Sequence, residues 1–193
     1  LERGAFGFGG GSGGSVGLGG SFCGVVGLKP TYGLVSRYGV VAMASSTDVI
    51  GPLTTRVEDA ALVLEVMSGK DQFDGTTIER SKESYTNLDF DIKGKKIGVI
   101  SDYFKEGLDP GVRKSILQSI EKLKKAGAEI VEVEIPSLSL ALACYYIIVP
   151  AEVSSNLSRY DGQRYGLFTK DSKNLDESYE QTRENGFEAE NKR

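Results

Sequence analysis

The sequence predicts an α/β fold, in which a mixed, mostly parallel sheet is covered by helices on both faces. One observation is a strand, a helix and a second strand in succession between residues 96 and 135, because this order joins two parallel neighbours by a crossover. Another is an amphipathic helical pattern that follows Thr55. With 193 residues and 39% hydrophobic content, residues 1–193 can form one sizeable core and are treated as part of a single domain.

The first 20 residues are dominated by glycine, from Gly4 to Gly20. Mixed glycine and serine is typical of a flexible linker. The alternative is a loop that shapes a site, because glycine allows tight turns and a close approach of the backbone. The apolar, turn-containing segment from Phe22 to Val41 follows without a break and favours this second interpretation, without excluding the linker.

The next element is a helix with its own start and stop signals. Thr55 and Glu58 have the spacing of a capping box, and Gly69 is a typical helix stop. We expect its apolar stripe to face the core; the stripe consists of Val57, Ala60, Ala61, Leu64 and Met67. Residues 70–94 are rich in Asp, Thr, Ser and Lys and predict a connection that crosses the surface.

The crossover unit can be divided into its parts. We expect a strand over Lys96 to Ile100, then a helix capped by Asp109 with Pro110 in its first turn, which ends at Gly127. The alternation of apolar residues with glutamate in residues 131–135 predicts the second strand, with one face exposed to solvent. The buried face of the helix is expected to comprise Val112, Ile116, Leu117, Ile120 and Leu123.

After Pro136 a largely apolar helix is expected to run toward Ser155. The most apolar stretch, residues 138–153, is shorter than the roughly 20 apolar residues of a spanning helix, so we expect no membrane segment; nor do we expect a secretory signal in these residues. Residues 170–193 are polar and predict a frayed end without a core element.

Charge and residue types exclude several chemistries. The formal net charge of -4 argues against nucleic acid as a directly bound ligand. The chain has no histidine, so it cannot supply a Ser-His-Asp triad or an imidazole zinc site, and we expect no metal. Cys23 and Cys144 have neither metal nor redox spacing and are expected to be buried thiols.

Three stretches together resemble the amidase-signature family. Its G-G-S motif matches Ser12-Gly13-Gly14-Ser15-Val16, and a long literal match follows from Ser21 to Gly33, which reads S-F-C-G-V-V-G-L-K-P-T-Y-G. Ser46 to Asp59 reads S-T-D-V-I-G-P-L-T-T-R-V-E-D, which is similar to the family's stretch before a core helix. Ser154 to Gly166, S-S-N-L-S-R-Y-D-G-Q-R-Y-G, is similar to the A subunits of the tRNA-dependent amidotransferases.

The resemblance implies roles for individual residues. Ser15 corresponds to the nucleophile, and the backbone of Ser12, Gly13 and Gly14 to the oxyanion hole. The proton would pass through a second serine, in a cis peptide, to a buried neutral lysine; both lie upstream of the motif in the family. A desolvated lysine can act as a base near neutral pH, which agrees with the absence of histidine.

The resemblance also implies a function for the parent protein. It would hydrolyse glutamine and release ammonia to a partner B subunit, which uses ATP and magnesium to amidate Glu-tRNA(Gln) or Asp-tRNA(Asn), with a small C subunit in the assembly. This chain itself would need no cofactor, and tRNA would be bound by the partner. The expected location is the bacterial cytoplasm, or alternatively a mitochondrion or plastid.

Other residues have two interpretations each. Tyr145 and Tyr146 resemble the wall of the family's glutamine pocket, but adjacent tyrosines on an apolar helix are also typical of a core or groove. Arg159 and Asp161 could line a pocket or form a surface ion pair. Lys29 is expected to be structural, with its amine bonded to backbone or carboxylate.

The motif departs from the family at four positions. The family's Asp, Thr, Arg and Pro correspond to Gly11, Ser12, Gly17 and Gly19. Loss of Asp and Arg together would remove a charge-assisted brace around the nucleophile turn. We therefore expect the chain to be inactive alone. Two other interpretations stay open: a free-standing amide hydrolase with another substrate, and a noncatalytic remnant of the same fold.

Overall fold

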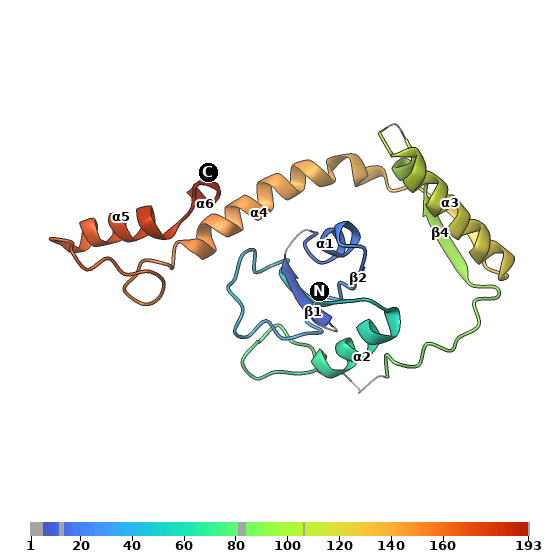
Figure 1. The fold of residues 1–193 in the computed structure, drawn as a ribbon, viewed down its shortest axis with the longest axis horizontal. Coiled ribbons are helices and arrows are strands. Elements are labelled where there is room, and N and C mark those ends of the chain that lie inside the picture. The colour runs from blue at the N-terminus through green and yellow to red at the C-terminus, as the bar shows by residue number, and fades with distance from the viewer. Residues whose placement is uncertain (1–5, 12–13, 81–83, 106, 193) are drawn as a thin grey trace. The chain divides into compact units, whose positions relative to one another are not determined.

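The structure is a computed structural model that describes residues 6–11, 14–80, 84–105 and 107–192. The chain forms two compact units. The first unit contains residues 1–86 and 145–193, and the second contains residues 87–144. Figure 1 shows the elements along the chain.

The first unit is built on a three-stranded antiparallel sheet. Its strands are β1 (Phe6–Gly11), β2 (Val26–Gly27) and β3 (Val49–Thr54), in the order β1-β3-β2. β1 pairs with β3 along its whole length, so that Gly10 lies opposite Ile50 and Gly11 opposite Val49. The glycine-rich segment is therefore a paired strand over residues 6–11, and not a slack linker there.

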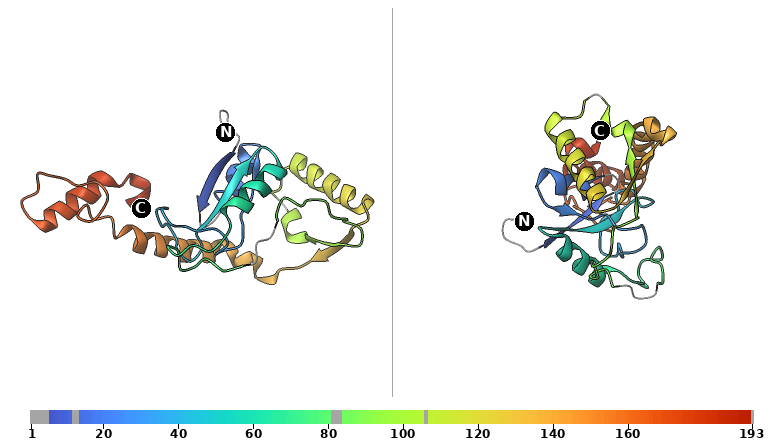
Figure 2. Two further views of the ribbon diagram at one scale, coloured as in Figure 1. Left: turned by 90° about the horizontal axis from the view of Figure 1, so that it is seen from below. Right: turned by 90° about the vertical axis from the view of Figure 1, so that its right-hand side faces the viewer.

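Two helices cover this sheet from opposite sides, as Figures 1 and 2 show. α1 (Gly17–Phe22) packs against β2, and α2 (Val57–Met67) packs against β2 and β3. The core on the α2 side is formed by Leu34, Val35 and Leu64, against which Leu28, Ile50, Met67 and Tyr85 pack. Apolar burial between one sheet and its covering helices stabilises this unit.

The start of α2 differs from the prediction. Its N-cap is Arg56, which makes no side-chain capping bond, so the proposed capping box at Thr55 is wrong. Thr55 precedes the capping position by one residue, and its side chain is therefore out of register with the free N–H groups. The apolar stripe is confirmed at Ala60, Ala61 and Leu64, which are buried, whereas Val57 is exposed.

The second unit confirms the predicted crossover. β4 (Lys96–Ile100) and β5 (Glu129–Val133) are parallel neighbours, joined through η1 (Ser101–Phe104) and α3 (Pro110–Lys125). The carboxylate of Asp109 accepts a hydrogen bond from the Val112 amide at 3.0 Å and caps α3. Gly127 follows the helix with a φ of 96°, the left-handed conformation that favours glycine.

The predicted buried face of α3 is wrong in this unit. Val112, Ile116 and Leu117 are each at least 40% exposed, and no residue of α3 is buried. The physical reason is the small size of the sheet. Two strands of five residues cannot cover both the length and the width of a 16-residue helix.

The apolar helix after Pro136 is confirmed as η2 (Pro136–Leu140) and α4 (Ala141–Leu157). Together they span 22 residues, with a window of mean hydropathy 1.5, which is long and apolar enough to cross a membrane by length and composition. This corrects the expectation that the segment is too short. Core helices of soluble proteins meet the same criterion, and in α4 the side chains of Glu152 and Asn156 bond to residues 43–46.

Residues 170–193 contain more structure than predicted. α5 (Leu175–Gly186) is capped by Asn174, whose side chain accepts from the Glu177 amide at 2.8 Å, and α6 (Ala189–Lys192) follows. Ser178 and Thr182 are buried against the segment before α5. The prediction of a frayed end is therefore wrong for the residues of α5.

The α/β class is confirmed, since helices accompany both a parallel pair and an antiparallel sheet. Within the described residues, the strands form two separate sheets, an antiparallel sheet of three strands and a parallel sheet of two, so the expected single, mostly parallel sheet is not observed. The expectation of two buried thiols is wrong, because Cys23 and Cys144 are exposed free thiols.

Candidate functional site

Ser15 lies in the turn that connects β1 to α1, at the surface of the first unit. Its hydroxyl donates a hydrogen bond to the Gly10 carbonyl oxygen at 2.8 Å. The chain thus turns back at the end of β1, so that residue 15 contacts residue 10. The turn continues directly into α1, where the Leu18 amide donates to the Gly14 carbonyl at 2.6 Å.

The glycines around Ser15 have a steric reason. A Cβ on Gly11 would lie 1.8 Å from the Ser15 Oγ, and a Cβ on Gly14 would lie 2.7 Å from the Leu18 Cδ1. By contrast, a Cβ on Gly10 would meet no atom within 4 Å. A side chain at residue 11 or 14 would therefore require the Ser15 hydroxyl or the end of the Leu18 side chain to move, while residue 10 has room for one.

Gly11 is one of the positions at which the sequence departs from the family motif. The space that the Cβ of an aspartate at residue 11 would need is filled here by the Ser15 hydroxyl. The departure and the orientation of the hydroxyl are thus linked by geometry.

The predicted oxyanion hole falls partly outside the described residues, because Ser12 and Gly13 are not among them. Gly14 is described, and its carbonyl accepts from Leu18. The assignment of backbone N–H donors at residues 12 to 14 stays a prediction.

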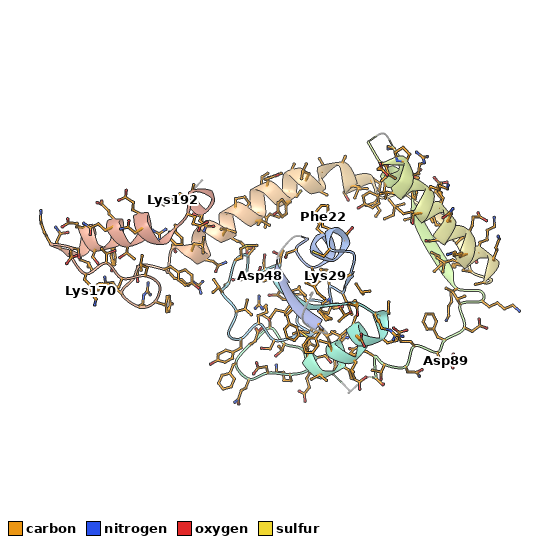
Figure 3. The ribbon with its side chains drawn as sticks, viewed as in Figure 1. Phe22, Lys29, Asp48, Asp89, Lys170 and Lys192 are labelled. Atoms are coloured by element: carbon orange, nitrogen blue, oxygen red, sulfur yellow. The ribbon has the colours of Figure 1, made fainter. Side chains whose placement is uncertain are left out.

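A cavity of about 480 Å³ lies beside the end of β1. Gly10 and Gly11 form one side of it, and the opposite walls come from the segment between β2 and β3 and from the turn at residues 73–74. Figure 3 labels Asp48, one of the lining residues, next to β1. Its apolar lining includes Tyr38, Val40, Val41, Met43 and Phe73.

The charged residues of this cavity are engaged in holding its walls. Arg37 donates to Asp74 through Nε at 3.1 Å, to the Thr76 hydroxyl at 3.0 Å and to the Ser45 carbonyl. Hydrogen bonds from Arg37 hold the pKa of Asp74 well below its ordinary value, against the opposing effect of burial. The same pairing raises the pKa of Arg37.

Asp48 also has a structural role in the wall of the cavity. Its carboxylate accepts from the amides of Met43 at 2.9 Å and Ala44 at 3.0 Å, and so closes the turn at residues 43–48. A carboxylate that accepts two backbone N–H bonds orders a loop. The walls beside Gly10 and Gly11 are therefore pre-formed by internal bonds rather than by a ligand.

Tyr145 and Tyr146 lie elsewhere in the first unit. Both are on α4, more than 40% exposed, with their rings edge to face at a centroid distance of 5.4 Å. They line a groove of about 1050 Å³ whose other side includes Arg183 and Phe187. This groove and the cavity at Gly10 share no lining residue, and Ser15 lines neither of them. The structure therefore does not place the two tyrosines and Ser15 in one pocket.

Other predicted residues have defined partners. Lys29, labelled in Figure 3, donates to the Pro30 carbonyl at 2.9 Å, which confirms its structural interpretation. Asp161 pairs with Arg164 at 2.9 Å, and Arg159 donates to Asn156 at 2.7 Å. Among the residues that the structure describes, no group of three His, Cys, Asp or Glu side chains could hold a metal ion.

Sequence reasoning missed the polar residues that hold the cavity, namely Arg37, Asp74, Glu152 and Asn156. One signal was present: Glu152 and Asn156 are four residues apart on a largely apolar helix, which places them on one face. For Arg37 and Asp74 the sequence offers no local signal.

Comparison with known proteins agrees with this fold. The model of the Amidase family matches residues 2–193. The A subunit of Glutamyl-tRNA(Gln) amidotransferase from Persephonella marina is 51% identical over 183 residues, which cover 94% of this chain and 38% of that relative. The chain therefore spans well under half the length of this relative.

Solved structures show the same similarity. The crystal structure of the A subunit of Glutamyl-tRNA(Gln) amidotransferase from Thermotoga maritima matches with a TM-score of 0.75 and 40% identity, over 84% of this chain and 35% of that chain. Native peptide amidase from Stenotrophomonas maltophilia matches with a TM-score of 0.70 and 34% identity, over 81% of this chain and 33% of that chain.

The α/β fold and the match over residues 2–193 define the class of protein as an amidase. The chain belongs to the Amidase family. Among its relatives are A subunits of Glutamyl-tRNA(Gln) amidotransferase.

Proposed function

We propose that this chain is the nucleophile-bearing part of an amidase-type glutaminase that supplies ammonia for tRNA-dependent amidation. The observation that carries the proposal is the position of Ser15, exposed in a glycine-rich turn between β1 and α1, in a chain 51% identical to the A subunit of an amidotransferase. Amide hydrolysis at a serine needs a hydroxyl at a surface open to substrate and backbone donors for the oxyanion. Ser15 is exposed and meets the first requirement.

Ser15 needs a base. Lys29 belongs to the G-L-K-P-T stretch and does not correspond to the family's triad lysine, and its amine donates to the Pro30 carbonyl. We propose that the lysine and cis-serine implied by the family complete the site from outside these residues, and that Ser12, Gly13 and Gly14 provide the oxyanion donors. The partners would be B and C subunits, with ATP and magnesium at the B subunit, and tRNA would be held there. The location that suits the bacterial relatives is the cytoplasm.

The substrate would be glutamine, and the acceptor Glu-tRNA(Gln) or Asp-tRNA(Asn). The similarity to a peptide amidase supports a second candidate, a free-standing amidase of another substrate. The stretch from Ser154 to Gly166 favours the first, since it resembles the amidotransferase branch. Tyr145 and Tyr146 then line a groove distinct from the one beside Gly10.

A chimera tests the proposal. Residues 1–193 replace the matching segment of the Persephonella marina protein, so that the relative supplies the remaining residues. We expect ammonia release from glutamine that Ser15→Ala reduces by at least about 10³-fold, the scale on which loss of a nucleophile acts. Ser115→Ala, at an exposed serine on α3, is the matched control and should leave the rate unchanged.

The other outcomes separate the candidates. Hydrolysis of simple aryl amides without hydrolysis of glutamine would favour the free-standing amidase. A folded chimera with neither activity would show that these residues are a noncatalytic remnant. Activity that survives Ser15→Ala would show that Ser15 is not the nucleophile.

A further inference from the structure

The Ser15 hydroxyl occupies the space that a side chain at residue 11 would need. The hydroxyl donates to the Gly10 carbonyl at 2.8 Å. A Cβ on Gly11 would lie 1.8 Å from the same oxygen, far inside van der Waals contact. This orientation of the hydroxyl is therefore possible only while residue 11 has no side chain.

The partner of the hydroxyl determines its reactivity. A serine attacks a carbonyl carbon only when its proton passes to a base as the new bond forms. A peptide carbonyl accepts a hydrogen bond but does not take up the proton at neutral pH. While Ser15 donates to Gly10, its proton points to an acceptor that cannot assist attack.

We propose that Gly11 is a positioning residue for Ser15, which permits a resting orientation of the hydroxyl on the Gly10 carbonyl that must be left before attack. The consequence for reactivity rests on the proposed function of Ser15, but the steric relationship does not. A side chain at residue 11 displaces the hydroxyl from this bond and frees it for a base.

The neighbouring glycine supplies a matched control. Gly10 and Gly11 are consecutive residues of β1, so their Cβ positions point to opposite faces. Gly11→Ala would bring a methyl group into steric conflict with the Ser15 hydroxyl, whereas a Cβ at Gly10 meets nothing within 4 Å. The two variants add the same group to the same strand and differ in whether it touches Ser15.

Nuclear magnetic resonance of the 193-residue chain with ¹³C-labelled serine measures the orientation directly. The Ser15 signal is the one that disappears in Ser15→Ala. Gly11→Ala should change the Cβ shift and the Hα–Hβ couplings of Ser15, and Gly10→Ala should leave them as they are. An unchanged Ser15 signal in Gly11→Ala, or an equal change in both variants, would overturn the proposal.

A second measurement covers loss of folding in Gly11→Ala. In a Ser15→Ala background the nearest remaining atom of residue 15 is its Cβ, at 3.1 Å instead of 1.8 Å. The fall in Tm caused by Gly11→Ala should therefore be smaller in that background, and a variant that fails to fold should recover folding there. An equal loss in both backgrounds, or a double variant that stays unfolded, would contradict the proposal.

Labelling by a fluorophosphonate links the orientation to reactivity. In the chimera described above, Gly11→Ala should accelerate labelling of Ser15 by roughly two- to tenfold, which corresponds to the net contribution of one hydrogen bond. Slower or unchanged labelling would overturn the link to reactivity. An inactive chimera whose Ser15 signal still responds to Gly11→Ala would contradict only the proposed function.

Discussion

Arg37 donates to the Asp74 carboxylate both from its backbone amide, at 2.8 Å, and from its guanidinium Nε, at 3.1 Å. The carboxylate is buried and the guanidinium mostly so. Arg37 also contacts the Thr76 hydroxyl and the Ser45 carbonyl, and lies over the Tyr32 ring at 5.1 Å. One ion pair thus joins the turn at residues 71–77 to the walls of the cavity beside β1.

Asp74→Ala should destabilise the first unit by about 3 kcal/mol, because it leaves a largely buried guanidinium without its counter-ion. Thermal or urea unfolding measures the loss. Glu58→Ala is the control, since Glu58 forms an exposed pair with Arg56 at 3.6 Å, and exposed pairs contribute little. Equal small effects of both substitutions would show that the Arg37 pair does not support the fold.

Acid should weaken the same interaction. The pKa of Asp74 lies below its ordinary value of 3.8 in the folded protein, chiefly because of the hydrogen bond from Arg37. The unfolded chain therefore binds more protons between the two pKa values, and stability rises with pH there. The contribution is complete above about pH 5 and is lost progressively as pH falls further. Unfolding from about pH 2 to about pH 6 should show this slope, and Asp74→Asn should reduce it.

Asn156 joins α4 to the loop that lines the cavity. Its amide nitrogen donates to the Met43 carbonyl at 3.0 Å, and its oxygen accepts from the Ser45 hydroxyl at 3.2 Å. Asn156 is buried, so Asn156→Leu would leave these partners without a bond at a cost of about 1–3 kcal/mol.

Hydrogen exchange gives a local measure of this contact. In Asn156→Leu the amides of residues 43–46 should exchange faster, while those of α3 should not change. Ser155→Ala, at the exposed neighbouring residue, is the control. Unaltered exchange at residues 43–46 would show that α4 does not hold the loop.

Features with a local cause could be predicted from the sequence. The start of α3 at Asp109 and Pro110 and the stop at Gly127 are observed, because a cap, a fixed φ and a left-handed glycine depend on neighbouring residues only. The parallel pair that α3 joins is also observed, because a strand–helix–strand order favours parallel neighbours.

Features set by distant residues could not be predicted. β1 contains four glycines in six residues and has little intrinsic preference for a strand; its pairing with β3, about 40 residues later, determines its conformation. The exposure of Ile116 on α3 depends on how much sheet is available to cover it. α5 was missed because polar composition outweighed a capping signal at Asn174 and Glu177.

The candidate site also has one part that the sequence predicts and another that depends on distant residues. The motif predicts which serine would be the nucleophile, but the hydrogen-bond partner of its hydroxyl depends on how the chain brings residue 15 to residue 10. The cavity walls depend on contacts between residues 37 and 74 and between residues 43 and 156. The periodicity of apolar residues along the sequence does not indicate which distant residues contact each other.

The contact between α1 and β2 gives a last prediction, because α1 begins two residues after Ser15. A Cβ on Gly27 would lie 2.2 Å from the Val16 carbonyl oxygen, so Gly27→Ala should cost about 1–3 kcal/mol, the range for overpacking. Gly19→Ala adds the same methyl group inside α1, where nothing lies within 4 Å, and should stabilise the helix by about 1 kcal/mol. Opposite shifts in Tm are therefore expected from two Gly→Ala changes eight residues apart. If both variants shift Tm in the same direction, α1 does not rest on β2 as described, and the path of the chain through Ser15 is then different as well.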